Sequence, residues 1–139
     1  MRGKCFCGVV RYALLSVPYD TGWCHCRICQ RTSGAPAVVF TTVPEGDLVF
    51  EQGRESLRSV ATTSFGRRQF CGECGTLLTI QVDFQADEID IAAATLDAPS
   101  GVAPGFHIFF ADRISWNEPG DALPRFDGWR PDTRGLPHR

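Results

Sequence analysis

Hydrophobic residues recur along this chain in short runs that are separated by glycine, proline and aspartate. Several runs alternate apolar and polar positions by two, as Ile89 and Ile91 do, and that period is typical of strands rather than helices. β-Branched and aromatic residues, which favour strands, are frequent within the runs. We therefore expect strands over residues 8–15, 37–43, 48–50, 57–65, 76–82, 88–96 and 106–114.

A single short helix is expected over residues 27–33, where Gly34 is placed to end it in the left-handed conformation. From Pro124 onward, prolines and glycines are mixed with arginine and aspartate, a composition that favours an irregular and loosely held segment. The whole pattern predicts a mainly β fold with little helix. We expect one domain over residues 1–126 and an irregular C-terminal tail over residues 127–139.

The composition is that of an ordinary folded domain, because 43% of the 139 residues are hydrophobic and only 22% are charged. The formal charge is −2 and the 14 basic residues are dispersed, so a nucleic-acid partner is not expected. The N-terminus lacks the apolar segment of a signal peptide, and no apolar run is long enough to span a bilayer. We therefore expect a cytoplasmic protein without a membrane partner.

Seven cysteines fall into three clusters, which a reducing cytosol makes more typical of metal binding or catalysis than of disulfides. Around the C-x-x-C cluster, Gly72 and Gly75 permit the backbone angles that a tight metal-binding turn requires. The C-x-C cluster is a weaker signal alone, but it is followed by Gly8 in the same way. The clusters are Cys5-x-Cys7, Cys24-His25-Cys26-x-x-Cys29 and Cys71-x-x-Cys74.

Zinc prefers four ligands in structural sites, so seven cysteines divide into a set of four and a set of three. The natural division makes a closed site from the two paired clusters and an open site from the compact triple cluster. A zinc ion with four thiolates carries 2 − 4 = −2, whereas one with three carries 2 − 3 = −1 and keeps a position for water or substrate. A metal at the open site would lower the pKa of an incoming thiol. The predicted ligands are Cys5, Cys7, Cys71 and Cys74 for the closed site, and Cys24, Cys26 and Cys29 for the open site.

Other readings of the cysteines stay open at this point. A histidine would complete a second structural site, although His25 lies between two expected ligands and should point away, His107 lies in an expected strand and His138 lies in the tail. A disulfide framework is disfavoured because no secretion signal is present. Iron on thiolates is the alternative to zinc.

Two groups of motifs surround these cysteines in a fixed order. The stronger ones are Gly3-x-Cys5-x-Cys7-Gly8, Cys24-His25-Cys26-x-x-Cys29-x-x-Thr32-Ser33-Gly34 and Arg68-x-Phe70-Cys71-x-x-Cys74-Gly75. Weaker ones follow at Ile89-Asp90-Ile91, Thr95-Leu96-Asp97, His107-Ile108 and Asp112-Arg113-x-x-Trp116. Over residues 3–126 this order resembles the family of glutathione-dependent formaldehyde-activating enzymes, which includes centromere protein V.

The resemblance implies layered antiparallel sheets, called a β-tent, that are stabilised by zinc. It also implies two zinc ions per chain, a structural one on the four-cysteine set and a catalytic one on Cys24, Cys26 and Cys29. Members with the named activity join glutathione to formaldehyde to give S-hydroxymethylglutathione, which is a carbon-sulfur lyase reaction in reverse. The expected partners are therefore a small thiol such as glutathione and an aldehyde.

A zinc-dependent thiol-adduct enzyme of the carbon-sulfur lyase class is the leading hypothesis. The alternative is a non-catalytic zinc-binding module that holds metal or docks a partner, and a redox sensor built on the triple cluster is a third reading. Near that cluster, Arg27, Arg31, Ser33 and Gly34 are candidates for binding a carboxylate, although a solvated face is the simpler reading. Trp23 and Phe106 are expected either to line a pocket or to lie in the core.

Overall fold

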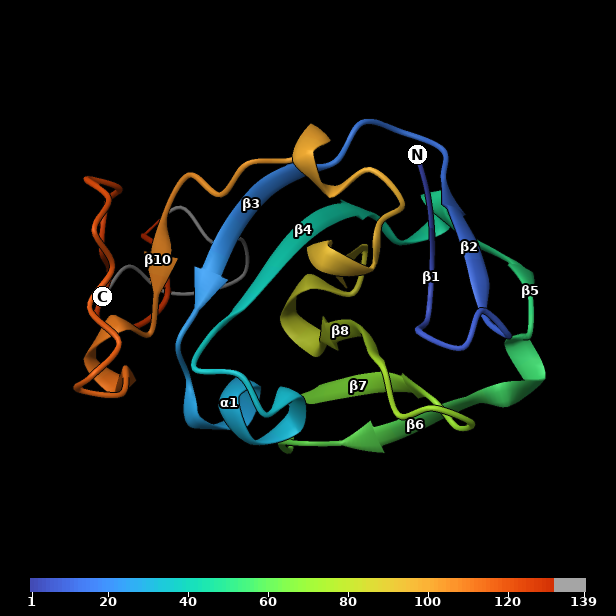
Figure 1. Cartoon of the computed structure of the whole chain (residues 1–139), viewed down its shortest axis with the longest axis horizontal. Helices are drawn as coiled ribbons and strands as arrows, with labels where there is room; N and C mark the ends of the chain where they lie inside the picture. Colours follow the sequence, from blue (N-terminus) through green and yellow to red (C-terminus); the bar gives the residue numbers. More distant parts are fainter. Residues whose placement is uncertain (132–139) are drawn as a thin grey trace.

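In a computed structural model that describes residues 1–131, the chain folds into two β-sheets with one short α-helix (Figure 1). The smaller sheet has the order β1-β2-β5, formed by Arg2–Lys4, Arg11–Leu14 and Leu48–Gln52. The larger sheet has the order β10-β3-β4-β9-β8-β7-β6. Its strands are β10 (His107–Ile108), β3 (Tyr19–Cys24), β4 (Val38–Pro44), β9 (Glu88–Ala92), β8 (Leu77–Val82), β7 (Gly66–Cys71) and β6 (Leu57–Ala61). The mainly β fold and its layered sheets are confirmed, and all neighbouring strands are antiparallel except the pair β10 and β3.

The sequence pattern missed three strands and overextended four others, of which β2 and β6 cover only part of the expected ranges 8–15 and 57–65. β1, β3 and β7 lack a regular apolar alternation, and pairing with neighbouring strands outweighs their weak propensity. The strand expected over residues 88–96 ends at Ala92, where a 3₁₀ turn begins. The strand expected over residues 106–114 is reduced to β10, because Phe109 adopts the left-handed conformation with φ of 51°.

Helix α1 (Arg27–Ser33) has the predicted bounds. Its first turn is capped by the Cys26 sulfur, which accepts a hydrogen bond from the Cys29 amide, and Gly34 ends it at φ of 71°. The remaining helical segments are 3₁₀ turns of three residues. They are η1 (Glu45–Asp47), η2 (Arg54–Ser56), η3 (Asp83–Gln85), η4 (Ala93–Thr95), η5 (Pro99–Gly101) and η6 (Phe110–Asp112).

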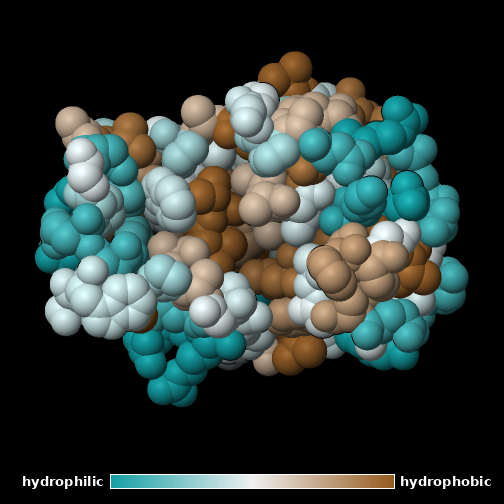
Figure 2. Space-filling view, viewed as in Figure 1, coloured by the Kyte–Doolittle hydropathy of each residue, from teal (hydrophilic) through white to brown (hydrophobic). Residues whose placement is uncertain are grey.

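Two hydrophobic clusters occupy opposite faces of the larger sheet. The first joins the two sheets through Tyr12 and Leu14 of β2, Val43 of β4 and Ile91 of β9. The second lies against α1 and contains Cys24, Cys29, Phe40, Leu77 and Ala92. Because successive side chains of a strand point to opposite faces, β4 and β9 contribute alternate residues to each cluster. Hydrophobic side chains also gather in a hollow near the middle of the face shown in Figure 2.

The described part of the C-terminal tail is irregular but packed, so the expectation that it is loosely held is wrong for residues 128–130. The Phe109 amide donates to the carbonyl oxygen of Gly128, and the Trp129 ring stands edge-on to the Phe109 ring. Arg130 forms an ion pair with Asp20 at 3.0 Å. Residues 132–139, which include His138 and the rest of the expected tail, lie outside the described residues. Within residues 1–131, no helix is long and apolar enough to cross a membrane.

Candidate metal centres and adjoining cavity

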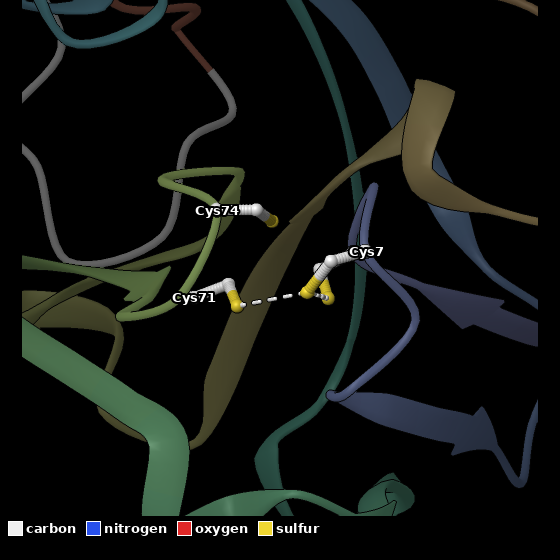
Figure 3. A group of neighbouring side chains, drawn as sticks. Cys7, Cys71 and Cys74 are labelled. Atoms are coloured by element: carbon white, nitrogen blue, oxygen red, sulfur yellow. Dashed lines mark hydrogen bonds between the residues drawn. The ribbon is translucent and has the colours of Figure 1, made fainter.

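The four cysteines predicted to form a closed site are brought together across the two sheets. Cys5 and Cys7 lie in the turn between β1 and β2, and Cys71 and Cys74 come from the end of β7 and the loop after it. Their sulfurs all lie within 4.8 Å of one another, with 3.5 Å between Cys5 and Cys7 and 3.8 Å between Cys7 and Cys71 (Figure 3). Four sulfurs around zinc at about 2.3 Å would be about 3.8 Å apart, so this set fits the ion.

Two turns with the same backbone conformation orient these sulfurs. Gly8 and Gly75 both have φ of 78°, and their amides donate to the carbonyl oxygens of Cys5 at 3.1 Å and Cys71 at 2.8 Å. A residue with a Cβ would be strained at that φ, which explains the glycine after each cysteine pair. The Thr76 hydroxyl lies 3.1 Å from the Cys74 sulfur. Although burial opposes ionisation, that hydroxyl and nearby amides lower the pKa of the Cys74 thiol to about 6.

The triple cluster is formed at the junction of β3 and α1. Cys24 ends β3, Cys26 caps the helix and Cys29 lies in its first turn. The Cys29 sulfur donates to the Cys24 sulfur at 3.4 Å, and the Cys26 sulfur accepts from the Cys29 amide at 3.3 Å. Hydrogen bonds from the other two thiols raise the pKa of Cys24 and lower that of Cys26, so Cys26 ionises more readily than Cys24. This soft set also suits zinc.

No histidine or carboxylate joins the triple cluster among residues 1–131. His25 is buried, and its Nε2 atom lies 2.8 Å from Nδ1 of His107. His107 in turn contacts the Asp121 carboxylate at 3.0 Å. The imidazole of His25 is therefore engaged by β10 and not by the cysteines, as its place in the sequence suggested.

Arg68 of β7 places a positive charge beside the triple cluster, and no local sequence pattern predicted that placement. Its side chain is 2% exposed, and Nη2 donates to the Cys29 sulfur at 3.3 Å while Nη1 donates to the Thr62 hydroxyl. A buried guanidinium is retained only where it is paired. With zinc bound to three thiolates, the local charge would be 2 − 3 + 1 = 0.

A cavity of about 200 Å³ opens beside the triple cluster. It lies on the face of the larger sheet that carries the second hydrophobic cluster, so alternate residues of successive strands line it. The strand residues that line it are Asp20, Gly22 and Cys24 (β3), Phe40 and Thr42 (β4), Glu88 and Asp90 (β9), Ile80 and Val82 (β8), Gly66 and Arg68 (β7) and Ile108 (β10). Ile28 of α1, Phe65, Phe106, Phe109, Trp129 and Arg130 complete most of the wall.

The cavity has carboxylates at the end away from the cysteines. Val38 pairs with Cys24 and Thr42 pairs with Asp90, so the four residue steps from Val38 to Thr42 along β4 separate the two ends by about 13 Å. Asp90 accepts a hydrogen bond from the Thr42 hydroxyl at 2.6 Å. Burial and the nearby Glu88 carboxylate outweigh that bond and raise the pKa of Asp90 to about 6.

The other residues considered from the sequence divide between the cavity and the rest of the structure. Phe106 lines the cavity, whereas Trp23 stacks on His107 instead. Arg27, Arg31, Ser33 and Gly34 are exposed and do not line it. Besides Arg68, the cavity residues that sequence reasoning missed include Asp90, which lies in one of the weaker motifs, and Trp129, which lies in the tail that was expected to be loose.

Comparison with known proteins identifies the family of this chain. The profile of glutathione-dependent formaldehyde-activating enzymes matches residues 1–112. The chain belongs to this family. A Halomonas elongata protein named for the same activity is 26% identical over 125 residues, which cover 85% of this chain and 80% of that protein. A Schizosaccharomyces pombe protein described as an uncharacterized lyase is 26% identical over 76 residues, 55% of this chain and 53% of its own length.

A solved structure has a similar fold. The crystal structure of a Rhodobacter sphaeroides protein superposes with a TM-score of 0.60 at 30% identity, covering 75% of this chain and 92% of that one. The family and the named relatives support an enzyme with a lyase-like, glutathione-related function. The sulfurs of the four-cysteine set and those of the triple cluster each lie close enough together to hold a metal ion.

Proposed function

We propose that this chain is a zinc-dependent enzyme of the carbon-sulfur lyase class that joins glutathione or a similar small thiol to formaldehyde. In this proposal the protein holds two zinc ions, a structural one on Cys5, Cys7, Cys71 and Cys74, and a catalytic one on Cys24, Cys26 and Cys29. We also propose a cytoplasmic location, the β-tent arrangement that the resemblance implies, and a domain over residues 1–126 followed by the tail over residues 127–139.

The convergence of three cysteine sulfurs at the wall of a cavity, without a fourth protein ligand among residues 1–131, carries the proposal. A closed site such as the four-cysteine set has no position for a substrate. The triple cluster differs because, in the part of the chain that the structure describes, it offers only three protein ligands and borders a cavity that has room for a small molecule. The family membership supports thiol and aldehyde chemistry at that place.

When bound there, zinc would supply Lewis acidity, which lowers the pKa of a thiol and polarises a carbonyl oxygen. The reaction adds S–H across C=O: a carbon-sulfur bond forms, the carbonyl π bond breaks and the thiol proton ends on oxygen. The chain holds Cys29 in place through Arg68 and the helix cap at Cys26. The wall around Phe40 and Ile80 is apolar, and electrostatic effects such as that of Arg68 are stronger in apolar surroundings than in water.

Metal analysis combined with an activity assay on Cys26→Ala tests this proposal. We expect two zinc ions in the unmodified protein, one in the variant, and a loss of at least about a hundredfold in thiol-aldehyde adduct formation. Cys74→Ser is the contrasting variant, because it should lower the melting temperature more than Cys26→Ala does. A single zinc ion in the unmodified protein, or full activity in Cys26→Ala, would overturn the proposal.

A further inference from the structure

We propose that the cavity beside Cys24, Cys26 and Cys29 binds the apolar body of an aldehyde larger than formaldehyde, an aliphatic or aromatic one. This inference rests on the proposed function, because it names the carbonyl substrate class of the same site. A one-carbon aldehyde has no body to contact the wall, so the wall would contribute nothing to its recognition.

Between the cysteines and the carboxylates at the opposite end, the lining of the cavity is mainly apolar. Strands β4 and β8 contribute Phe40 and Ile80 to the wall, and β10 with the residue after it contributes Ile108 and Phe109. Phe65 and Trp129 also line the cavity. Phe40 is only 8% exposed. Burying apolar surface against such a wall stabilises a bound molecule in proportion to the area removed from water.

The charged groups that line the cavity already have partners within the protein. Arg68 donates to Cys29 and Thr62, and Arg130 pairs with Asp20 and lies over the Phe106 ring at 4.0 Å. Asp90 is hydrogen-bonded to Thr42. A charged molecular body would have to displace these pairs, since burying an unpaired charge is costly.

Charge therefore favours a neutral occupant, and the placement of the cysteines orients it. An aldehyde whose carbonyl lies near the triple cluster extends its body along β4 toward Thr42, over a length of up to about 13 Å. The thiol, with its charged groups, reaches the carbonyl from outside this space. The products and the bond changes are those already given for S–H addition across C=O.

A series of unbranched aldehydes from propanal to hexanal tests the inference, because their carbonyl groups have the same intrinsic reactivity. With zinc-loaded protein and glutathione, the initial rate above the uncatalysed rate gives kcat/KM for each. We expect kcat/KM to rise by up to about fourfold with each methylene, which corresponds to about 0.8 kcal/mol per buried CH₂. A flat or falling series overturns the inference.

Formaldehyde distinguishes the two failures. If formaldehyde is turned over while the longer aldehydes are not, the inference fails and the proposed function stands. If no aldehyde reacts above the uncatalysed rate, the proposed function fails, and the inference falls with it.

Two tryptophans provide a matched pair of variants. Trp129→Ala removes part of the wall and should flatten the rise of kcat/KM with chain length, whereas Trp116→Ala, at a ring that is 73% exposed and outside the cavity, should keep it. Phe65→Ala gives a second test of the wall if Trp129→Ala fails to fold. An unchanged rise in a folded wall variant overturns the inference.

Discussion

Replacing Arg68 by methionine should destabilise the protein far more than the same change at the neighbouring Arg67. Both residues lie on β7, but Arg68 is 2% exposed and donates to the Cys29 sulfur, whereas Arg67 is exposed and donates to the Ser59 hydroxyl. Methionine keeps an unbranched side chain and removes the charge. With zinc bound, Cys29 would be a thiolate paired with Arg68, and removing one partner of a buried ion pair costs about 3–5 kcal/mol, because the other charge stays buried and unpaired.

The size of the effect follows from the charge balance of the triple cluster. With zinc bound, Arg68→Met changes the local sum from 2 − 3 + 1 = 0 to −1. For a chain of 139 residues, a loss of about 3 kcal/mol lowers the melting temperature by about 10 °C. Arg67→Met should remain within about 0.5 kcal/mol of the unmodified protein.

Urea denaturation of zinc-saturated protein measures both free energies of unfolding, and metal analysis of the folded variants reports whether the second zinc is retained. Equal stability of Arg68→Met and Arg67→Met, with zinc content unchanged, would refute the assignment of Arg68 as the charge-balancing partner of the cluster. Arg68→Lys adds a graded step, since it keeps the charge but loses the planar fork of donors.

Three further predictions concern the cavity and the metal. Gly22→Ala should lower the free energy of unfolding, measured by urea denaturation, by about 1–3 kcal/mol, because a Cβ there would lie 2.2 Å from the Phe106 ring. Gly46→Ala is the control, because a Cβ at that position meets nothing within 4 Å. Equal losses in the two variants would contradict the close packing at Gly22. The pKa of Asp90 is raised from 3.8 to about 6 in the folded protein, so the unfolded chain loses that proton at a lower pH. The free energy of unfolding that Asp90 contributes should therefore be fully present below about pH 4. It should fall by up to about 3 kcal/mol as the pH rises through about 6. Asp90→Asn should remove that fall, and a difference curve that rises over this window would show the sign to be wrong. Stripping metal with a strong chelator should lower the melting temperature markedly, since ligand sets of this kind are coupled to folding; an unchanged melting temperature after proven zinc removal would disprove it.

The cysteine clusters were the most predictable part of the protein, because the spacing of metal ligands within each cluster is a local feature of the sequence. Helix α1 was predictable for the same reason, since Gly34 is a local signal for its end. β3 and β7 were not, because their residues have weak strand patterns and gain their conformation from neighbouring strands. Arg68 and Trp129 reach the cavity only through long-range packing, and no local pattern reports that.

The alternation of side chains along β4 and β9 divides two tasks between neighbouring positions. Phe40, Thr42 and Asp90 face the cavity, while Val43 and Ile91 face the cluster that joins the two sheets. A change of substrate preference is therefore accessible to evolution, or to a directed library, through positions whose replacement leaves the joint between the sheets untouched. Selection can therefore act on the cavity-facing residues separately from the residues that join the sheets, so the same fold can adapt to many carbonyl compounds without losing stability first.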